Sequence, residues 1–424
     1  MTDASLAWPA RGWLDRATGF FDGMARWSAV GLLLGVPTSI ALVNISILFL
    51  LIGWAGSGRW QRKWDALRAS PLTLPVVLLS AWMLLGMAWT EADRKVIGSH
   101  LYVYSKLPLM LVLLTVFDDA RWRQRGWWAF AVGCLITLGS TYASIWVQIP
   151  WADSYQRGFG VSHHIFNDYI AQGLAMSVFV AWVVSQAIDA KQPLLRWGWA
   201  LVAALGVFSV THLLEGRTGQ VTVLAMGLAM VMTIESARVR WTMVVLLVAG
   251  AVVLAFSSPL IVARVTQALA EARQYDSAGV VSTSIGARLD MWRNAWGMFL
   301  DSPWIGHGPG GYRVLSTAIY SIGAQCSVSC IHPHNQYLFF LVDHGLPGLL
   351  MYLWVLGCLA ALVWRSHGAQ RALVTGFLAV LLVDGFINGP FWVTTERHLF
   401  ATVLPLLMAA WPSRPSPTAG AGTA

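Results

Sequence analysis

Long apolar stretches recur along almost the entire chain and constrain its fold more than any single motif does. Apolar residues make up 57% of the 424 residues and charged residues only 11%, whereas soluble domains carry about a quarter charged residues. Backbone polar groups inside a bilayer must be hydrogen-bonded within the protein, so apolar stretches of this length are expected to be transmembrane helices. The composition therefore predicts an all-α polytopic membrane protein rather than two or three soluble domains.

About twelve stretches have roughly the length of a membrane span. The first two form one continuous apolar run, which we divide at Pro37 because proline interrupts the helical hydrogen-bond ladder. The count of twelve depends on that division. The expected helices are 24–37, 38–55, 71–90, 102–118, 126–147, 167–189, 197–214, 218–236, 242–263, 345–364, 371–387 and 396–412.

These stretches define the expected organisation of the chain and its orientation. Residues 1–263 form a first part of the bundle, 264–344 a large polar loop, 345–412 a second part and 413–424 a tail. Short segments on the side of the N-terminus hold about three times as many Lys and Arg residues as the opposite short loops. Both termini are therefore expected in the cytoplasm, and the large loop is expected on the outer side. The net charge of +8 is spread over short loops without a contiguous basic patch, which excludes a nucleic-acid partner.

The four cysteines agree with that topology. Cys134 and Cys358 fall within expected helices, where a free thiol behaves as a small apolar residue. Cys326 and Cys330 lie four residues apart in the outward loop, where a disulfide is chemically permitted. A bridge between them and two free thiols are both compatible with the sequence. A metal site is disfavoured, because two thiols and a neighbouring histidine make an incomplete ligand set.

The outward loop contains a second helical pattern, which carries arginines. Apolar residues recur at helical spacing between residues 286 and 300 and predict an amphipathic helix whose apolar face rests on the membrane. Arg288 lies near its start and Arg293 about one turn later. Glycines between residues 306 and 311 permit a tight turn after the helix ends. The apolar residues of the face are Leu289, Trp292, Trp296 and Phe299.

His334 opens a short apolar run that is broken at Gly345, and it is the candidate base. Near a helix N-terminus the dipole disfavours imidazolium, so the ring stays neutral and able to accept a proton. Asn335 is expected to cap this helix or to orient His334. A merely structural loop histidine is the alternative interpretation, and His332 is the candidate base if the register differs.

Arg217 stands in a short turn between two expected spans. If Arg217 and Arg288 converge, they form a clamp suited to a diphosphate. Arg264 and Arg293 would widen that cationic field. Alternatively, Arg217 anchors a helix end or pairs with Glu215, and Arg288 is a solvated surface residue.

The motif region resembles the bacterial O-antigen ligase and polymerase superfamily, best over residues 280–365. The total length near 400 and the single large loop are similar to the lipopolysaccharide O-antigen ligases within it. One departure is the pair Asp343-His344, where relatives often show glutamate and then a small or apolar residue. The residues that carry the resemblance are Arg288, Trp292, Pro303-x-x-Gly306-x-Gly308, His334-Asn335-x-x-Leu338 and Gly345.

This resemblance implies a GT-C-like glycosyltransferase in the bacterial inner membrane, with its active site facing the periplasm. The donor would be an O-antigen polysaccharide on undecaprenyl diphosphate, and the acceptor a sugar hydroxyl of lipid A–core. His334 would act as general base, while Arg217 and Arg288 stabilise the leaving diphosphate. No metal or cofactor is expected, since the resemblance implies metal-independent transfer and the loop aspartates are scattered.

Three alternatives remain at this point. An O-antigen polymerase and a protein O-oligosaccharyltransferase belong to the same superfamily and use the same type of donor. A transporter of lipid-linked glycan would place ionisable residues in mid-span. Apart from His212, we expect the spans to be nearly free of such residues, which disfavours transport.

Overall fold

A computed structural model describes residues 10–152, 156–257, 259–278, 283–320 and 330–411. Within these ranges all regular structure is helical, which confirms the all-α prediction, and each of the twelve expected stretches contains a helix. The helices are α1 (Ala10–Gly35), α2 (Ile40–Gly56), α3 (Trp60–Ala69), α4 (Thr73–Leu85), the 3-10 turn η1 (Gly86–Ala88), α5 (Arg94–Tyr104), α6 (Lys106–Val116), α7 (Ala120–Ala143), α8 (Tyr169–Asp189), α9 (Pro193–His212), α10 (Arg217–Val231), α11 (Ala237–Ser257), α12 (Pro259–Ala278), α13 (Ser284–Asp301), α14 (Gly311–Tyr320), α16 (Gln336–Arg365), α17 (Gly368–Ile387) and α18 (Thr394–Met408).

Several of these helices are long and apolar enough to cross a membrane. Among the described residues, five segments meet this condition: Arg94–Val116, α8, α9, α16 and α17. A sixth is added if α2 and α3, which are bent by 114°, form one broken span. The chain is thus a helical membrane protein, while the number of twelve spans stays a prediction.

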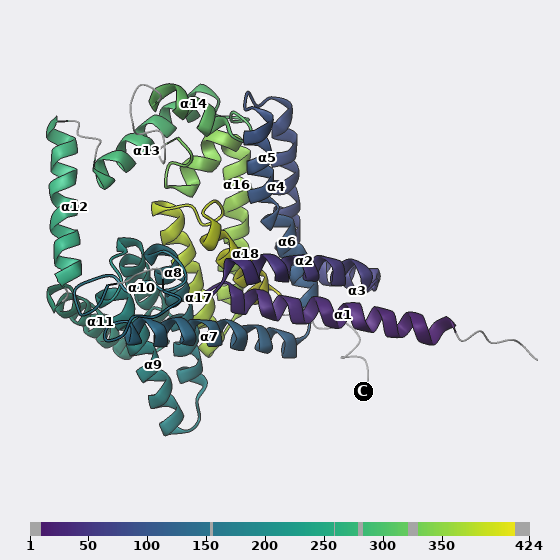
Figure 1. The fold of residues 1–424 in the computed structure, drawn as a ribbon, viewed down its shortest axis with the longest axis horizontal. Coiled ribbons are helices and arrows are strands. Elements are labelled where there is room, and N and C mark those ends of the chain that lie inside the picture. The colour runs from purple at the N-terminus through teal and green to yellow at the C-terminus, as the bar shows by residue number, and fades with distance from the viewer. Residues whose placement is uncertain (1–9, 153–155, 258, 279–282, 321–329, 412–424) are drawn as a thin grey trace, which may run out of the picture.

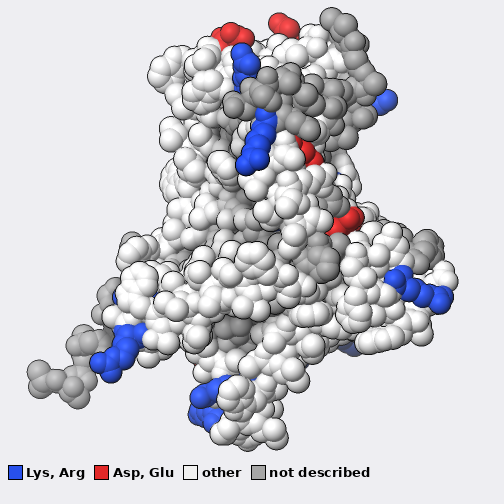
Figure 2. Space-filling model, turned by 90° about the vertical axis from the view of Figure 1, so that its left-hand side faces the viewer, with Lys and Arg blue, Asp and Glu red and all other residues white. Residues whose placement is uncertain are grey.

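The helices run in two main directions. In Figure 1, α1, α2 and α7 lie side by side and run horizontally, whereas α4, α5 and α16 run almost at right angles to them. The helices of the large loop, α12, α13 and α14, follow the left and upper edges of the same view. Most of the face in Figure 2 is uncharged, and its Lys and Arg side chains form small separate groups at the upper part and the lower extremities.

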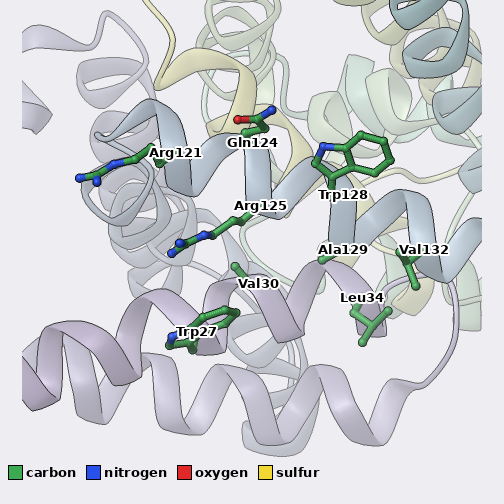
Figure 3. A pocket seen from close by; sticks show the side chains of 9 residues that line it. All are labelled: Trp27, Val30, Leu34, Arg121, Gln124, Arg125, Trp128, Ala129 and Val132. Atoms are coloured by element: carbon green, nitrogen blue, oxygen red, sulfur yellow. The ribbon is translucent and has the colours of Figure 1, made fainter. Parts of the chain in front are cut away.

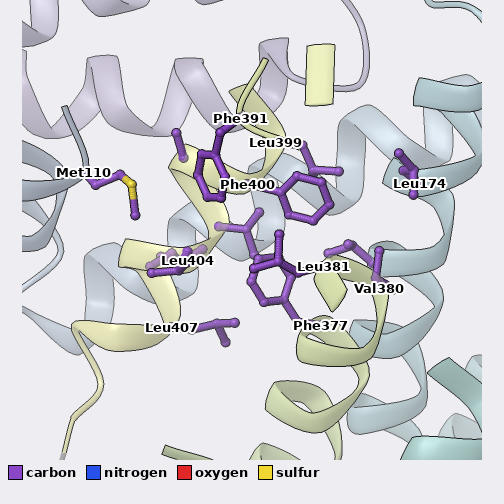
Figure 4. Close-up of a cluster of buried hydrophobic side chains, with 14 of the residues drawn as sticks. Met110, Leu174, Phe377, Val380, Leu381, Phe391, Leu399, Phe400, Leu404 and Leu407 are labelled. Atoms are coloured by element: carbon purple, nitrogen blue, oxygen red, sulfur yellow. The ribbon is translucent and has the colours of Figure 1, made fainter. Parts of the chain in front are cut away.

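Helix α18 lies at the centre of the molecule. Every residue from Thr395 to Met408 is buried. Phe400 and Leu404 belong to the cluster shown in Figure 4, together with Phe377 from α17 and Met110 from α6. In a bilayer such close packing, rather than exclusion from water, holds helices together. This central helix therefore presents little surface to lipid.

Helix α16 is interrupted where the sequence predicts a break. Gly345 has φ 63° and ψ −168° inside the helix, a backbone conformation that favours glycine. The interruption leaves backbone groups without helical partners. The N–H of Leu346 donates to the carbonyl of Pro303 at 2.9 Å, and the N–H of His307 donates to the carbonyl of Val342 at 2.9 Å. The turn 303–307 thus fills the break.

Glycines make this close approach possible. A Cβ on Gly306 would lie 2.5 Å from the backbone nitrogen of Gly345, and a Cβ on Gly345 would lie 2.6 Å from the carbonyl oxygen of Trp304. Both glycines have positive φ. The glycine-rich motif therefore serves backbone packing between the loop and α16.

The beginning of the large loop differs slightly from the sequence prediction. The expected span 242–263 ends earlier, because α11 stops at Ser257 and a new helix begins at Pro259. Proline at the first position of a helix is common, since its missing N–H would be unpaired there anyway. The helix predicted over 286–300 is α13, whose N-terminus is capped by the hydroxyl of Thr283, which accepts from the N–H of Gly286 at 3.1 Å.

Candidate functional site

His334 lies directly before α16 in an unusual backbone conformation. Its φ of 49° is one of two positive values among non-glycine residues in the described ranges. Its N–H donates to Nδ1 of His332 at 2.9 Å. Asn335 is the N-cap of α16, since its side-chain oxygen accepts from the N–H of Leu338 at 3.0 Å. The position at a helix N-terminus, with Asn335 as the cap, is thus confirmed, and strain of this kind is typical of functional sites.

Hydrogen bonds that link His334 to Asn388, and Asn388 to Glu396, fix the orientation of the His334 ring. The amide nitrogen of Asn388 donates to Glu396, so the amide oxygen of Asn388 faces Nδ1 of His334 at 3.1 Å. Nδ1 must therefore carry the hydrogen of a neutral ring. The lone pair is left on Nε2, which can accept a proton from a substrate.

Glu396 also belongs to a pair of buried acidic side chains. Asp384 on α17 and Glu396 on α18 are adjacent and almost fully buried. The expectation that the spans are nearly free of ionisable residues is wrong, because Asp384 lies within the predicted span 371–387 and Lys106 within 102–118. A carboxylate inside an apolar helix is itself a signal of a functional site. The stretch 371–387 is apolar on average, so its average hydropathy does not reveal Asp384.

Helix α13 is attached to the histidine segment. The indole Nε1 of Trp292 donates to the carbonyl of Pro333 at 2.9 Å, and its ring packs edge-on against Phe386. The face expected to rest on the membrane is thus mixed. Trp292 packs inward and Trp296 is half exposed, while the buried residues of α13 include Met291 and Ala295.

Arg288 lies on α13, one turn before Trp292, and its charge affects the pKa of His334. Burial is the main cause that lowers the pKa of His334, and the positive charge of Arg288 lowers it further. The hydrogen bond with Asn388 opposes this shift. The ring is therefore neutral at pH 7, as a general base must be.

Arg217 and Arg288 lie near one another. Burial is the main cause that lowers the pKa of Arg288, and the like charge of Arg217 is the second; arginines nevertheless stay protonated in proteins. Arg217 begins α10, and its Nη1 lies 3.7 Å from Oε2 of Glu271 on α12. Glu271 also accepts from the N–H of Ile285 at 3.0 Å. Glu271, which the sequence does not single out, thus links Arg217 to the start of α13.

The other candidate residues are less directly placed. Arg293 is exposed, and five residues of helix turn it about 140° away from Arg288. Arg264 lies on α12, and its side chain falls outside the described residues. His332 is buried, with its ring 4.6 Å from that of Phe339, and it holds the backbone of His334.

The cysteine and metal predictions can be followed only in part. Cys134 and Cys358 are free and buried, and Cys330 is disulfide-bonded. Cys326 falls outside the described residues. Within the described ranges, no group of three His, Cys, Asp or Glu side chains is arranged to hold a metal ion.

The structure thus places Arg288 within electrostatic reach of both His334 and Arg217, and it places His334 beside Asn388, which is hydrogen-bonded to the buried Glu396. These features define a polytopic helical membrane protein with a cationic site between its large polar loop and its membrane helices. Residues 212–353 match the family model described as O-antigen ligase, which confirms the resemblance to the O-antigen ligase superfamily. The family indicates ligase- or polymerase-type glycosyl transfer. No curated protein matches the chain significantly. The matched segment contains all three site residues but ends before Asn388 and Glu396.

Proposed function

We propose that this protein is an O-antigen ligase, a twelve-span, GT-C-like enzyme of the bacterial inner membrane with its active site facing the periplasm. It transfers a polysaccharide from undecaprenyl diphosphate to a sugar hydroxyl of lipid A–core. The observation that carries the proposal is the contact of His334 Nδ1 with the amide oxygen of Asn388, which leaves Nε2 as the proton acceptor, together with Arg288, which acts on His334 and has Arg217 as its own neighbour. The family match over residues 212–353 supports the same chemistry.

In the proposed reaction the two arginines bind the donor. Arg288 and Arg217 hold the diphosphate, and Glu271 connects Arg217, at the start of α10, to Ile285 at the start of α13. The acceptor hydroxyl attacks the anomeric carbon while Nε2 of His334 removes its proton. The bond between the anomeric carbon and the diphosphate oxygen breaks, and its electron pair stays on the diphosphate. Fixed positive charges placed where this negative charge develops lower the barrier without reorganisation.

A lipopolysaccharide gel tests the proposal. A strain that lacks the protein is complemented with the wild type, with His334→Ala, or with His367→Ala as control. His367 is an exposed histidine at the start of α17. We expect the O-antigen ladder with the wild type and the control. With His334→Ala we expect its loss, with polymer accumulating on the lipid carrier.

Other gel patterns would point to the alternatives. A core that carries a single repeat in the deletion strain would indicate a polymerase. An unchanged ladder would remove lipopolysaccharide as the acceptor and direct attention to glycoproteins. A loss of lipid-linked polymer from the outer face would favour a transporter.

A further inference from the structure

A groove between α1 and α7 lies apart from the candidate active site. It has a volume of about 500 Å³ and is largely open to the surface, a volume in the range of sites for drug-sized ligands. Figure 3 shows that side chains from both helices line it along its length. Trp27 and Leu34 come from α1, and Arg121, Arg125 and Val132 come from α7.

The groove changes from cationic to apolar along its axis. Arg121 and Arg125 lie at one end beside Trp27, and Leu34 and Val132 lie at the other. Trp27 and Val132 are both exposed. Tryptophan at the boundary between a charged zone and an apolar zone is typical of a membrane interface. The arginine end is on the side that the charge distribution assigns to the cytoplasm.

The positive charge at this end is only partly compensated. Arg121 pairs with Asp119 at 3.1 Å. The guanidinium of Arg125 lies over two aromatic rings, 4.4 Å from the centroid of Trp122 and 5.4 Å from that of Trp27. In the described part of the chain no carboxylate lies within ion-pair distance of Arg125. The end of the groove therefore carries a net positive charge with a donor available to an anion.

We propose that this groove binds one anionic phospholipid. Its phosphate contacts Arg125 and Arg121, and an acyl chain follows the apolar wall past Leu34 and Val132. Basic pockets between membrane helices on the cytoplasmic side favour anionic head groups. A lipid also satisfies both ends of the groove, which a free phosphate or a purely apolar molecule cannot do.

Lipid binding to the full-length protein in detergent tests this assignment. Native mass spectrometry compares phosphatidylglycerol with phosphatidylethanolamine that has the same acyl chains. We expect the wild type to prefer the anionic lipid by about tenfold or more, because basic residues near the membrane surface attract anionic lipids. The variant R121Q/R125Q should lose this preference, and R121K/R125K should keep most of it.

A matched control removes two arginines elsewhere. R196Q/R238Q takes away the same charge from exposed positions on α9 and α11 and should keep the preference. Val132→Trp fills the apolar end and should weaken binding of phosphatidylglycerol while both arginines remain. All variants are checked for an unchanged melting temperature.

Three results would overturn the assignment. The first is equal binding of the two lipids to the wild type. The second is an equal loss of preference in R121Q/R125Q and R196Q/R238Q, which would show a general charge effect. The third is full competition by inorganic phosphate together with no effect of Val132→Trp, which would show a phosphate site instead of a lipid site.

Discussion

At the scale of single residues, the candidate site depends on one strained histidine and the side chains that hold it. A left-handed conformation at a non-glycine residue costs about 1–3 kcal/mol. His332 binds the N–H of His334, and Trp292 binds the carbonyl just before it. Several contacts thus fix a conformation that the residue alone would avoid, and the ring is aimed before any substrate binds.

Asn388 is expected to act through the tautomer of His334. Asn388→Ala removes the acceptor for Nδ1–H, so the ring can turn or exchange its hydrogen. We expect kcat to fall about 10- to 100-fold, as when other orienting partners are lost, with little change in KM. Kinetics with purified protein measure this, and Asn44→Ala, at an exposed position of α2, is the control. A change confined to KM would contradict the assignment.

The pH profile should respond to Arg288. Burial and the charge of Arg288 both lower the pKa of His334, so the neutral form persists below the ordinary value of about 6.5. Activity of the wild type should therefore decline only below that pH. In Arg288→Gln the lowering charge is gone, the pKa of His334 rises, and the acid limb of kcat/KM should move to higher pH. In Arg288→Lys it should stay close to the wild-type position.

At the scale of elements, the break in α16 and the turn 303–307 act as one unit. The sequence predicts a tight turn near Gly306 and a break at Gly345, but not that the two meet. The hydrogen bonds that join them connect residues about forty positions apart, and no local pattern encodes such a pairing. In the same way, helical spacing predicts α13 but not that Trp292 reaches Pro333.

Substitution of Gly306 by alanine should disrupt this unit. The new Cβ would meet the backbone of Gly345 at 2.5 Å, and the positive φ of 67° adds strain. We expect a loss of about 1–3 kcal/mol in stability together with a weaker O-antigen ladder. Thermal unfolding in detergent measures the first effect. Gly357→Ala is the control, since Gly357 lies in α16 and its new Cβ would meet open space. An equal melting temperature for the two variants would refute the docking role.

At the scale of the whole molecule, hydrophobicity predicts the helices well and their environment poorly. Each of the twelve apolar stretches is helical, because their backbone has no other way to pair its polar groups in a bilayer. The stretch that forms α18 is nevertheless enclosed by protein. An apolar pattern alone does not separate a helix that faces lipid from one that faces other helices, so neither the number of spans nor the place of Asp384 follows from it.

The orientation of the chain can be measured with reporter fusions. The excess of Lys and Arg on one side predicts a cytoplasmic C-terminus. Green fluorescent protein fused after Trp411 should fluoresce, and alkaline phosphatase fused there should be inactive. Alkaline phosphatase inserted in the large loop should be active. The opposite pattern would place the candidate site in the cytoplasm and remove the proposed donor from its reach.

The order of the docked segments along the chain also bears on biosynthesis. Inserting an interrupted helix into a membrane costs free energy, because its unpaired amides and carbonyls cannot form hydrogen bonds with water there. Here the segment that satisfies them, residues 303–307, leaves the ribosome before residues 342–346. The turn 303–307 has therefore already been synthesised when α16 is inserted. Its hydrogen bonds with residues 342–346 can form without any later part of the protein.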